Sequence, residues 1–431
     1  MSGQKPREIA VQVLGRRTGG DFVELLLERA LAYQELSSPD RHLCQELVYG
    51  IVRWQATLDW LIARKTANRT QKPALQNLLR LGLYQIFWLE RIPNHAAVHE
   101  TVELAKRHGY GPQAGFINAL LRGYLREFAP TKQLLDQLKT TEPAVGFSHP
   151  DWLVTRWQQR WGAPATEQLL AWNNSPPKTF ARVNTLKTDA ARLLPQWREE
   201  NVAYDFVRHD WVEENLVFEL KSHPPLSRMA SFQQGLFYIQ DPSTLLAVRE
   251  LAPQPGDTVL DLCAAPGGKL TYIAQLMANQ GRLLAHDTAP ERLKLVEENC
   301  QRLGVSCAET VLPSTLNSQL STRFDRILLD APCSNTGVMR RRVDLRWRIR
   351  LEELARLRET QLELLAQAAG RLKRGGTLVY STCSLEPEEN LAVVKEFLSG
   401  QPEFTLETER ELRPFAEGVD GAYVARLKRQ G

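Results

Sequence analysis

The chain has 431 residues, which at roughly 100 to 200 residues per domain predicts two or three domains. Hydrophobic residues make up 43% of the chain and charged residues 24%, and these fractions exclude a disordered chain, a collagen-like repeat and a coiled coil. No stretch approaches the roughly 18 apolar residues that a membrane span needs, and the N-terminus lacks the apolar run of a signal peptide. We therefore expect a cytoplasmic protein with no membrane partner.

The number of cysteines and the distribution of charge limit the class of protein further. Six cysteines are too few and too scattered for a disulfide scaffold, and no CxxC pair is present to hold a structural metal. His95 and His99 have the spacing of a zinc pair, but no third ligand accompanies them, so we expect no metal and a structural or RNA-facing role for both. Residues 1–140 carry 19 Lys and Arg against 13 Asp and Glu. This basic excess is compatible with a polyanionic partner such as nucleic acid.

Helical periodicity extends from Lys5 to about Leu138, where apolar residues recur at spacings of three and four. Turn residues interrupt it, for example Gly19-Gly20 and Pro93-Asn94. The pattern predicts an all-helical domain over residues 1–140.

The remainder of the chain has mixed periodicity. The mixed pattern over residues 141–235 predicts a linker and a small α/β subdomain. After Gly256, the short apolar runs TVLDLC, GRLLAHD, FDRILLD and GGTLVYSTC alternate with helical stretches, as in a doubly wound parallel sheet. This α/β domain is predicted to occupy residues 236–431.

A glycine-rich turn follows the first strand of this sheet. It consists of Cys263, Ala264, Ala265, Pro266, Gly267, Gly268 and Lys269. A strand, a glycine-rich turn and a helix start place backbone N–H groups beside any ligand bound at the carboxyl ends of the strands. The turn is neither GxGxxG nor a phosphate-binding P-loop. The second strand ends at Asp287, where a carboxylate can accept hydrogen bonds from ribose hydroxyls. Together these features predict S-adenosylmethionine as the cofactor.

Two cysteines follow two other strands of the predicted sheet. Cys333 follows Asp330 in DAPCS, and Cys383 ends the next strand in STCS. Parallel strands deliver their carboxyl ends to one edge of a sheet, so both thiols are expected beside the cofactor loop. Addition of a thiolate at C6 of cytosine makes C5 nucleophilic enough to accept a methyl group. Asp330 is placed to hold or protonate N3 of the ring. These residues alone leave open which cysteine attacks.

Three segments, CAAPGGK, DAPCSNTGVMRRRVDLRW and STCSLEPEEN, resemble the signatures of the RNA (cytosine-5) methyltransferases of the Nol1/Nop2/Sun family. The segments PNHAAVHETVELAK and GFINALLRG resemble the NusB-like helical RNA-binding domain. The resemblance implies an all-α NusB-like domain, a small α/β connecting subdomain and a Rossmann-like, class I S-adenosylmethionine-dependent methyltransferase domain. It also implies 16S rRNA as the substrate, and we expect a monomer.

The resemblance implies roles for individual residues. Cys383 takes the role of the nucleophile that attacks C6, and Cys333 assists product release. The loop from Cys263 to Lys269 binds S-adenosylmethionine, Asp287 binds its ribose, and Asp330 lines the cofactor and cytosine pocket.

The sequence departs from the family pattern at three places. The stretch AETVLPSTL lacks the acid that the family places near the adenine, although Glu309 could substitute. Asn335 stands where the family more often has Gly or Ala, and Val343 where Pro is common.

An arginine-rich segment follows Cys333. It contains Arg340, Arg341, Arg342, Arg346, Trp347, Arg348 and Arg350. Such a segment can neutralise phosphates while the indole stacks on an unpaired base, and we expect it to contact RNA. The opposing interpretation is a solvated charged helix start.

Three functions remain possible from the sequence. The first is a cytosine-5 methyltransferase of 16S rRNA, or of another RNA such as tRNA. The second is an amino-group methyltransferase, which DAPC disfavours because such enzymes typically carry an Asn/Asp-Pro-Pro-aromatic motif. The third is a non-catalytic RNA-binding assembly factor, which the intact cofactor loop and both cysteines disfavour.

Overall fold

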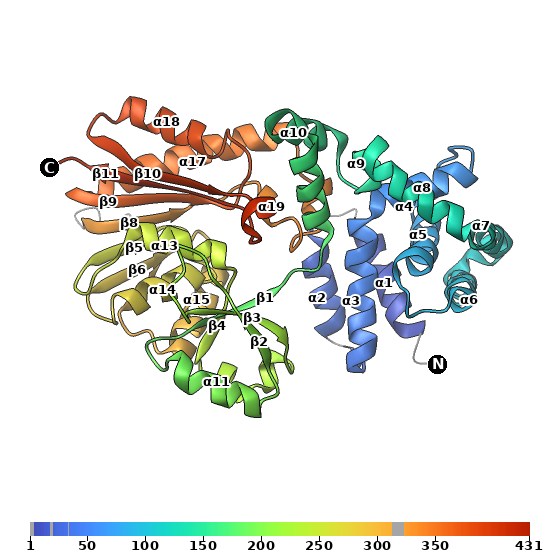
Figure 1. Ribbon diagram of the computed structural model, residues 1–431, viewed down its shortest axis with the longest axis horizontal. Coiled ribbons are helices and arrows are strands. Elements are labelled where there is room, and N and C mark those ends of the chain that lie inside the picture. The colour runs from blue at the N-terminus through green and yellow to red at the C-terminus, as the bar shows by residue number, and fades with distance from the viewer. Residues whose placement is uncertain (1–3, 18–19, 33, 313–322) are drawn as a thin grey trace. The chain divides into compact units, whose positions relative to one another are not determined.

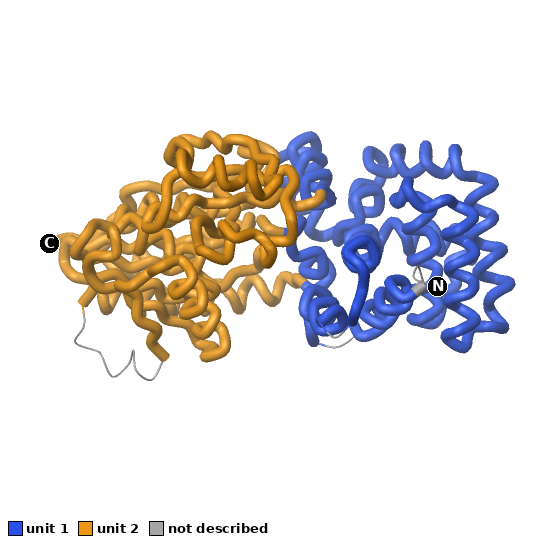
Figure 2. The backbone as a smooth tube through the Cα atoms, turned by 90° about the horizontal axis from the view of Figure 1, so that it is seen from below, with its two compact units in different colours: residues 1–175, 339–348 blue, residues 176–338, 349–431 orange. Residues whose placement is uncertain are grey.

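The computed structural model describes residues 4–17, 20–32, 34–312 and 323–431. The chain divides into two compact units, shown in separate colours in Figure 2. The first unit comprises Met1–Ser175 and Met339–Arg348, and the second comprises Pro176–Val338 and Ile349–Gly431. The backbone therefore passes between the units three times, and a ten-residue segment of the C-terminal half belongs to the N-terminal unit.

The first unit is helical. Its α-helices are α1 (Gln4–Arg16), α2 (Val23–Ala32), α3 (Ser38–Arg53), α4 (Gln55–Lys65), α5 (Pro73–Trp88), α6 (Asn94–Ala105), α7 (Ala114–Arg126), α8 (Phe128–Thr141), α9 (Pro143–Gly146) and α10 (Asp151–Asn174). Two short turns of helix, η1 (Lys106–Tyr110) and η2 (Gly111–Gln113), join α6 to α7, and η6 (Leu345–Trp347) lies in the inserted segment. Helix α5 is buried along most of its length, because it packs against α1, α3, α4, α6 and α7.

The second unit begins with a small antiparallel sheet. Its strands are β1 (Thr179–Val183), β2 (Ala203–Phe206), β3 (Val217–Ser222) and β4 (Phe237–Ile239), in the order β2-β3-β1-β4. Helices α11 (Ala190–Glu199) and α12 (Ala230–Gln233) accompany it, with η3 (Leu226–Arg228) before α12. Trp197 of α11 is fully buried against Phe218 and Phe237, which gives this subdomain its own core.

A seven-stranded sheet forms the rest of the second unit (Figure 1). Its strands are β5 (Thr258–Asp261), β6 (Arg282–His286), β7 (Ala308–Val311), β8 (Phe324–Asp330), β9 (Leu372–Thr382), β10 (Phe404–Leu412) and β11 (Ala422–Arg429), in the order β10-β11-β9-β8-β5-β6-β7. The five strands from β9 to β7 are parallel, whereas β11 is antiparallel to both of its neighbours. The connection from β10 to β11 is too short for the crossover that a parallel pair needs.

Helices cover both faces of this sheet. They are α13 (Leu245–Leu251), α14 (Gly268–Leu276), α15 (Pro290–Leu303), α17 (Leu351–Arg371), α18 (Leu391–Gly400) and α19 (Pro414–Glu417), with the short turns η4 (Pro242–Thr244) and η5 (Thr336–Val338). Successive strand residues enter opposite cores: Val379 packs with the α13 and α14 side, and Leu378 and Tyr380 with the α17 and α18 side. Burial on both faces explains why these strands are apolar runs rather than alternating ones. The predicted helical domain followed by a Rossmann-like α/β domain is confirmed.

The compact units differ from the domain boundaries expected from the sequence. Residues 141–175, expected to open the connecting region, contain α9 and all of α10 and group with the preceding helices. The reason is local packing, since α9 contacts α4 and α8, and α10 contacts α9. The small sheet itself lies within the predicted range of 141–235 except for β4, which follows it.

Candidate active site

The glycine-rich loop connects β5 to α14 at the carboxyl edge of the large sheet. The Ala264 amide donates to the His286 carbonyl oxygen at 2.9 Å, which ties the loop to the end of β6. Gly267, immediately before α14, has φ of 101°, a conformation that residues with a side chain rarely adopt. The loop therefore adopts its shape because glycine occupies this position.

Asp287, directly after β6, is buried beside this loop. Its carboxylate accepts hydrogen bonds from the amides of Ala265 at 3.4 Å and Ala289 at 3.3 Å, and it pairs with Arg292 at 3.2 Å. The residue expected to bind ribose thus lies against the loop expected to bind the cofactor. Its assignment to ribose remains a proposal.

A lysine, a carboxylate and a serine hydroxyl lie together at the same edge. Lys269 donates to Asp330 at 2.6 Å, and the Ser381 hydroxyl donates to the other oxygen of Asp330 at 2.8 Å. Burial alone would lower the pKa of Lys269, but the Asp330 carboxylate outweighs that effect and raises it, so Lys269 is an ammonium ion. Three elements, α14, β8 and β9, therefore position one half-buried ion pair.

Asp261, the last residue of β5, has a buried carboxyl group without a hydrogen-bond partner among the described residues. The residue is 1% exposed, and the lack of a partner holds for both carboxylate oxygens. Burial, with the nearby Asp330 carboxylate, raises the pKa of Asp261 to about 8. A buried carboxylate without a partner is costly unless a cation or donor reaches it. The sequence analysis did not single out this residue.

The two predicted cysteines lie in contact. The Sγ atoms of Cys333 and Cys383 are 3.4 Å apart, Cys333 is 9% exposed and Cys383 is half-buried. The Cys383 thiol also donates to Oδ1 of Asn335 at 3.1 Å. The hydrogen bond to Cys383, together with burial, raises the pKa of Cys333 well above the ordinary value for a thiol. Cys333 is therefore protonated at neutral pH.

Glu389 holds the two cysteine loops together. It is fully buried and accepts hydrogen bonds from the Ser334 amide at 2.8 Å, the Ser334 and Ser384 hydroxyls, and the Gln361 side chain at 3.1 Å. Ser334 and Ser384 each follow one of the two cysteines, so one carboxylate fixes both turns. Glu389 lies in the EPEEN part of the motif, but the residues alone did not show which of its acids faces inward.

Gly337 allows the same two loops to approach closely. A Cβ atom at this position would lie 2.7 Å from the Cys383 carbonyl oxygen and 2.7 Å from Cα of Gly421. The Gly337 amide donates to the Cys383 carbonyl oxygen at 2.9 Å. Any side chain here would push the two cysteine loops apart.

The small sheet contributes Arg182 to the cofactor region. This guanidinium is buried and donates to the Gly268 carbonyl oxygen at 2.8 Å, the Thr271 hydroxyl at 2.9 Å and the Gln240 side chain. Burial lowers the pKa of Arg182 to about 10, so it remains a cation. Arg182 thereby fixes the start of α14, a role that the sequence analysis missed.

The arginine-rich segment is placed differently from the expectation. Residues 339–348 pack within the helical unit, where Arg346 is fully buried. Its guanidinium donates to the carbonyl oxygens of Arg53, Ser148 and Asn173 and to the side chain of Asn174, at distances from 2.8 to 3.3 Å. Burial lowers the pKa of Arg346 to about 9. Direct contact of this side chain with RNA phosphate, as expected from the sequence, is wrong because the guanidinium is fully buried and its two terminal nitrogens already donate to these oxygens.

Arg340 and Trp347 are also used for packing. Arg340 is 1% exposed and lies over the Trp172 ring at 3.9 Å, and the Trp347 indole donates to the Val52 carbonyl oxygen at 2.8 Å. The expected RNA contact is therefore wrong for the Arg340 side chain, and the Trp347 indole N–H already has a partner. Arg341 is half-buried, whereas Arg342 and Arg350 are exposed, and RNA contact by these three remains a proposal.

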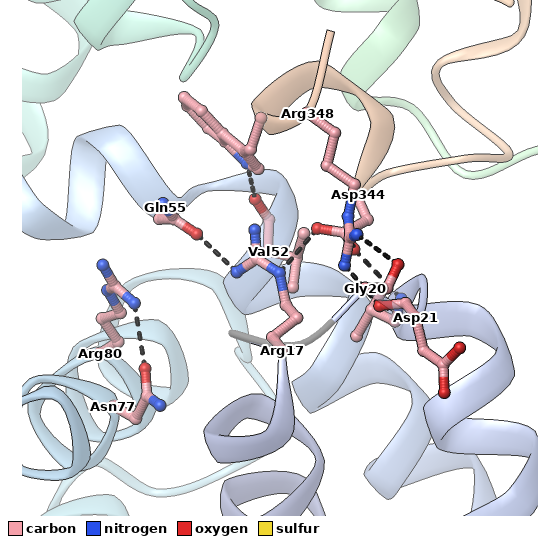
Figure 3. A network of polar contacts seen from close by, with 11 residues as sticks. Arg17, Gly20, Asp21, Val52, Gln55, Asn77, Arg80, Asp344 and Arg348 are labelled. Carbon is pink, nitrogen blue, oxygen red and sulfur yellow. Dashed lines mark hydrogen bonds and ion pairs between the residues drawn. The ribbon is translucent and has the colours of Figure 1, made fainter.

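Asp344 is the centre of a charged network in this unit (Figure 3). Its carboxylate pairs with Arg17 at 2.6 Å and with Arg348 at 2.8 Å, and it accepts from the Val23 amide at 3.1 Å. The Val23 contact places a negative charge at the N-terminus of α2, where the helix dipole favours it. Ion pairs between Asp344 and the two arginines therefore help to hold residues 339–348 against the preceding helices.

Replacing Arg346 with methionine is expected to destabilise the helical unit by about 2 to 4 kcal/mol, because its carbonyl partners lose a buried donor. Urea unfolding followed by circular dichroism measures the change. The matched control is Arg342→Met, at an exposed position, with an expected change within about 0.5 kcal/mol. Weaker RNA binding by the Arg346 variant at unchanged stability would contradict the packing role.

Glu309 is not placed to replace the missing adenine-side acid. It pairs with Arg282 at 3.0 Å, and Arg282 begins β6, at the amino end of that strand and away from the cofactor loop. Residues 313–316 of the same stretch lie outside the described residues.

The described residues contain neither a membrane-spanning helix nor a cluster of metal ligands. No helix there has the length and apolar character to cross a membrane, and no three His, Cys, Asp or Glu side chains gather as metal ligands. His95 and His99 are both exposed on α6.

A Rossmann-like sheet with a glycine-rich cofactor loop at its carboxyl edge is the architecture of class I S-adenosylmethionine-dependent methyltransferases. A family model described as 16S rRNA methyltransferase RsmB/F matches residues 248–428. The NusB family model matches residues 4–126, and a ferredoxin-like domain of RsmF/B-like methyltransferases matches residues 149–222.

Curated proteins show the same relationship over the whole chain. The probable ribosomal RNA small subunit methyltransferase B of Bacillus subtilis is 37% identical over 99% of both chains. The corresponding protein of Escherichia coli O1:K1 is 35% identical over 91% of this chain and 92% of its own. The chain therefore belongs to the RsmB/F family of 16S rRNA methyltransferases, and the predicted family is confirmed.

Solved structures agree with this assignment. The crystal structure of PH0851 has a TM-score of 0.80 and covers 100% of this chain and 99% of its own, at 24% identity, a level that shows the fold alone. A methyltransferase homolog protein from Pyrococcus horikoshii is 30% identical, has a TM-score of 0.58 and covers 69% of this chain and 99% of its own.

The residues present fit S-adenosylmethionine, the methyl donor of this class. Asp261 offers a buried carboxylate that a positively charged ligand group would satisfy, and Asp287 offers a carboxylate beside the loop. The predicted cofactor is consistent with both observations and with the family.

Proposed function

We propose that this protein methylates C5 of a cytidine in 16S rRNA through a covalent bond between Cys383 and C6. The observation that carries the proposal is the contact of 3.4 Å between two thiols at the ends of two parallel strands, at the edge that holds the cofactor loop. The NusB-like helical unit is assigned to RNA binding, and a monomer suffices for this chemistry.

The hydrogen bonds at the thiols support a ranking of the two cysteines. The Cys383 hydrogen faces Oδ1 of Asn335, which can only accept, so the bond between the thiols is donated by Cys333. Cys333, whose pKa is raised, remains a thiol that can donate a proton to Cys383. This arrangement favours Cys383 as the nucleophile and Cys333 as the group that assists its release.

The first step forms the bond between Sγ of the Cys383 thiolate and C6. The electron pair of the C5–C6 double bond moves into the ring. N3 then gains a proton from the Lys269–Asp330 pair. C5 is then the nucleophilic carbon. When bound, S-adenosylmethionine supplies a methyl carbon on a positively charged sulfur, which retains the bonding electrons as C5 is methylated.

The second step releases the product. The proton on C5 leaves, its electron pair restores the ring double bond, and the C6–Sγ bond breaks. In the proposed assignment the Cys333 thiol protonates the departing sulfur of Cys383, and the Cys333 thiolate accepts the C5 proton. N3 returns its proton, so both cysteines end as thiols.

Release of tritium from C5 tests the proposal. Transcribed 16S rRNA with tritium at C5 of cytidine is expected to lose one tritium to water for each methyl group transferred, and Cys383→Ala is expected to lose none. Methyl incorporation without tritium release would indicate an amino or ribose position instead. Methylation of tRNA but not of 16S rRNA would identify tRNA as the substrate. No methyl incorporation into any RNA would favour the non-catalytic assembly factor.

A further inference from the structure

Asn335 completes a closed ring of hydrogen bonds with the two cysteines. Cys333 donates to Cys383, Cys383 donates to Oδ1 of Asn335 at 3.1 Å, and Nδ2 of Asn335 donates to the Cys333 carbonyl oxygen at 2.7 Å. Asn335 directly precedes η5 and has φ of 59°, in the left-handed region that asparagine tolerates better than most residues. A residue without a side-chain oxygen at this position would leave the ring open.

The orientation of the Asn335 carboxamide follows from its partners. The Cys333 carbonyl oxygen is an acceptor, so the NH₂ group must face it. The carboxamide oxygen then has to face Sγ of Cys383. An oxygen that only accepts stabilises a protonated thiol and repels a thiolate.

We propose that Asn335 is a positioning residue that holds Cys383 as a protonated thiol until substrate binds. The inference rests on the proposed role of Cys383 as the nucleophile. When RNA enters, rotation of the carboxamide would remove the acceptor from the sulfur. The Cys383 proton would then pass to water, and the Cys333 hydrogen would still reach the thiolate. The attacking form of Cys383 would then arise mainly in the presence of the target base.

The other charged groups near the thiols do not account for this restraint. The Lys269 ammonium interacts with Cys383 through space, and its hydrogen-bond partner is Asp330. Glu389 acts on Cys333, and its carboxylate is held by the serines and Gln361. Among the described residues, Asn335 is the group that accepts a hydrogen bond from the Cys383 thiol.

The test is alkylation of Cys383 by iodoacetamide in the full-length protein without RNA, with the modified peptide located by mass spectrometry. Asn335→Gly keeps the backbone conformation and removes the acceptor, so the rate at pH 7 is expected to rise about three- to tenfold. Asn335→Asp keeps the size of the side chain and adds a negative charge, although the hydrogen bond to the Cys333 carbonyl oxygen is lost, so the rate is expected to fall by a similar factor, about three- to tenfold.

The matched control is Asn215→Gly, at an exposed asparagine with φ of 60°. Its alkylation rate is expected to equal that of the wild type. Loss of a side chain also opens access to the sulfur, so the alkylation rate is followed from pH 6 to 10. Loss of the proposed acceptor lowers the pH of half-maximal rate in Asn335→Gly, and the added charge raises it in Asn335→Asp. Easier access to the sulfur changes only the maximal rate at high pH.

An unchanged half-maximal pH in both variants, or a change in the same direction in both, would overturn the proposal. Near-ultraviolet circular dichroism checks that each variant is folded, and Asn335→Ala provides a second loss of the acceptor if the glycine variant is not. Alkylation uses no RNA, so its outcome is separate from tritium release. If the half-maximal pH moves in opposite directions in the two variants but the wild type releases no tritium, the proposed role of Asn335 stands and the proposed reaction is rejected.

Discussion

Mixing the Cys333→Ala variant with unmodified 16S rRNA and S-adenosylmethionine is expected to give a covalent protein–RNA complex that survives denaturing electrophoresis. Cys383 can still add to C6, but the thiol 3.4 Å away that would protonate the departing sulfur is gone. Addition and methylation therefore outpace release, and turnover is expected to fall at least about a hundredfold.

Two variants complete this experiment. Cys383→Ala is expected to give no covalent complex and no methylated product, and the double variant is expected to behave in the same way. A complex that appears in Cys383→Ala instead would exchange the two roles. Methylation by wild type with no complex in any variant would contradict a covalent intermediate.

Binding of S-adenosylmethionine is expected to strengthen as the pH rises from 6 to 8, by up to about tenfold per pH unit. In the unligated protein, burial and the Asp330 carboxylate raise the pKa of Asp261 to about 8, so this carboxyl is largely protonated at pH 6. A positively charged ligand group favours the ionised form, and the bound proton must leave when the ligand binds. Calorimetry in two buffers of different ionisation enthalpy measures the proton that is released.

The same carboxyl predicts how the stability of the unligated protein depends on pH. Its pKa is near 4 in an unfolded chain and about 8 in the folded one, so the folded state holds the extra proton between these values. Stability contributed by that proton is present at low pH and is lost as the pH rises towards 8.

Asp261→Asn tests both consequences of this carboxyl. The variant is expected to melt at a higher temperature than wild type at pH 8.5 without ligand, and to bind S-adenosylmethionine more weakly with a smaller pH dependence. Glu309→Gln, at an exposed acid away from the loop, serves as the control. Unchanged ligand affinity in Asp261→Asn would show that the carboxylate does not face the ligand's charge.

The large sheet and its functional edge could be predicted from the sequence. Apolar strand runs alternate with helices, and this pattern requires parallel strands whose carboxyl ends meet at one edge. The rule was sufficient to bring Asp330, Cys333 and Cys383 to the edge that carries the cofactor loop, because it depends only on chain direction. Strand direction failed as a guide at β10 and β11, where a short connection makes the pairing antiparallel.

Only the tertiary structure decided which polar groups meet. Arg346 was expected at a phosphate, because an arginine in a basic run has the same local sequence whether it is buried or solvated. Its partners are the carbonyl groups of Arg53, Ser148 and Asn173, which lie far away along the chain. The same limit applies to Asn335 and Glu389, since a side chain's partner is set by how two loops pack and not by the residues beside it.

The sequence by itself thus determined the class of fold, the cofactor loop and the pair of cysteines, since each follows from local periodicity and strand direction. The tertiary structure decided the hydrogen-bonded order of the two thiols, the lack of a hydrogen-bond partner at Asp261 and the burial of Arg340 and Arg346. These depend on distances of about 3 Å between residues of different elements, and hydrogen-bond strength falls steeply beyond that range.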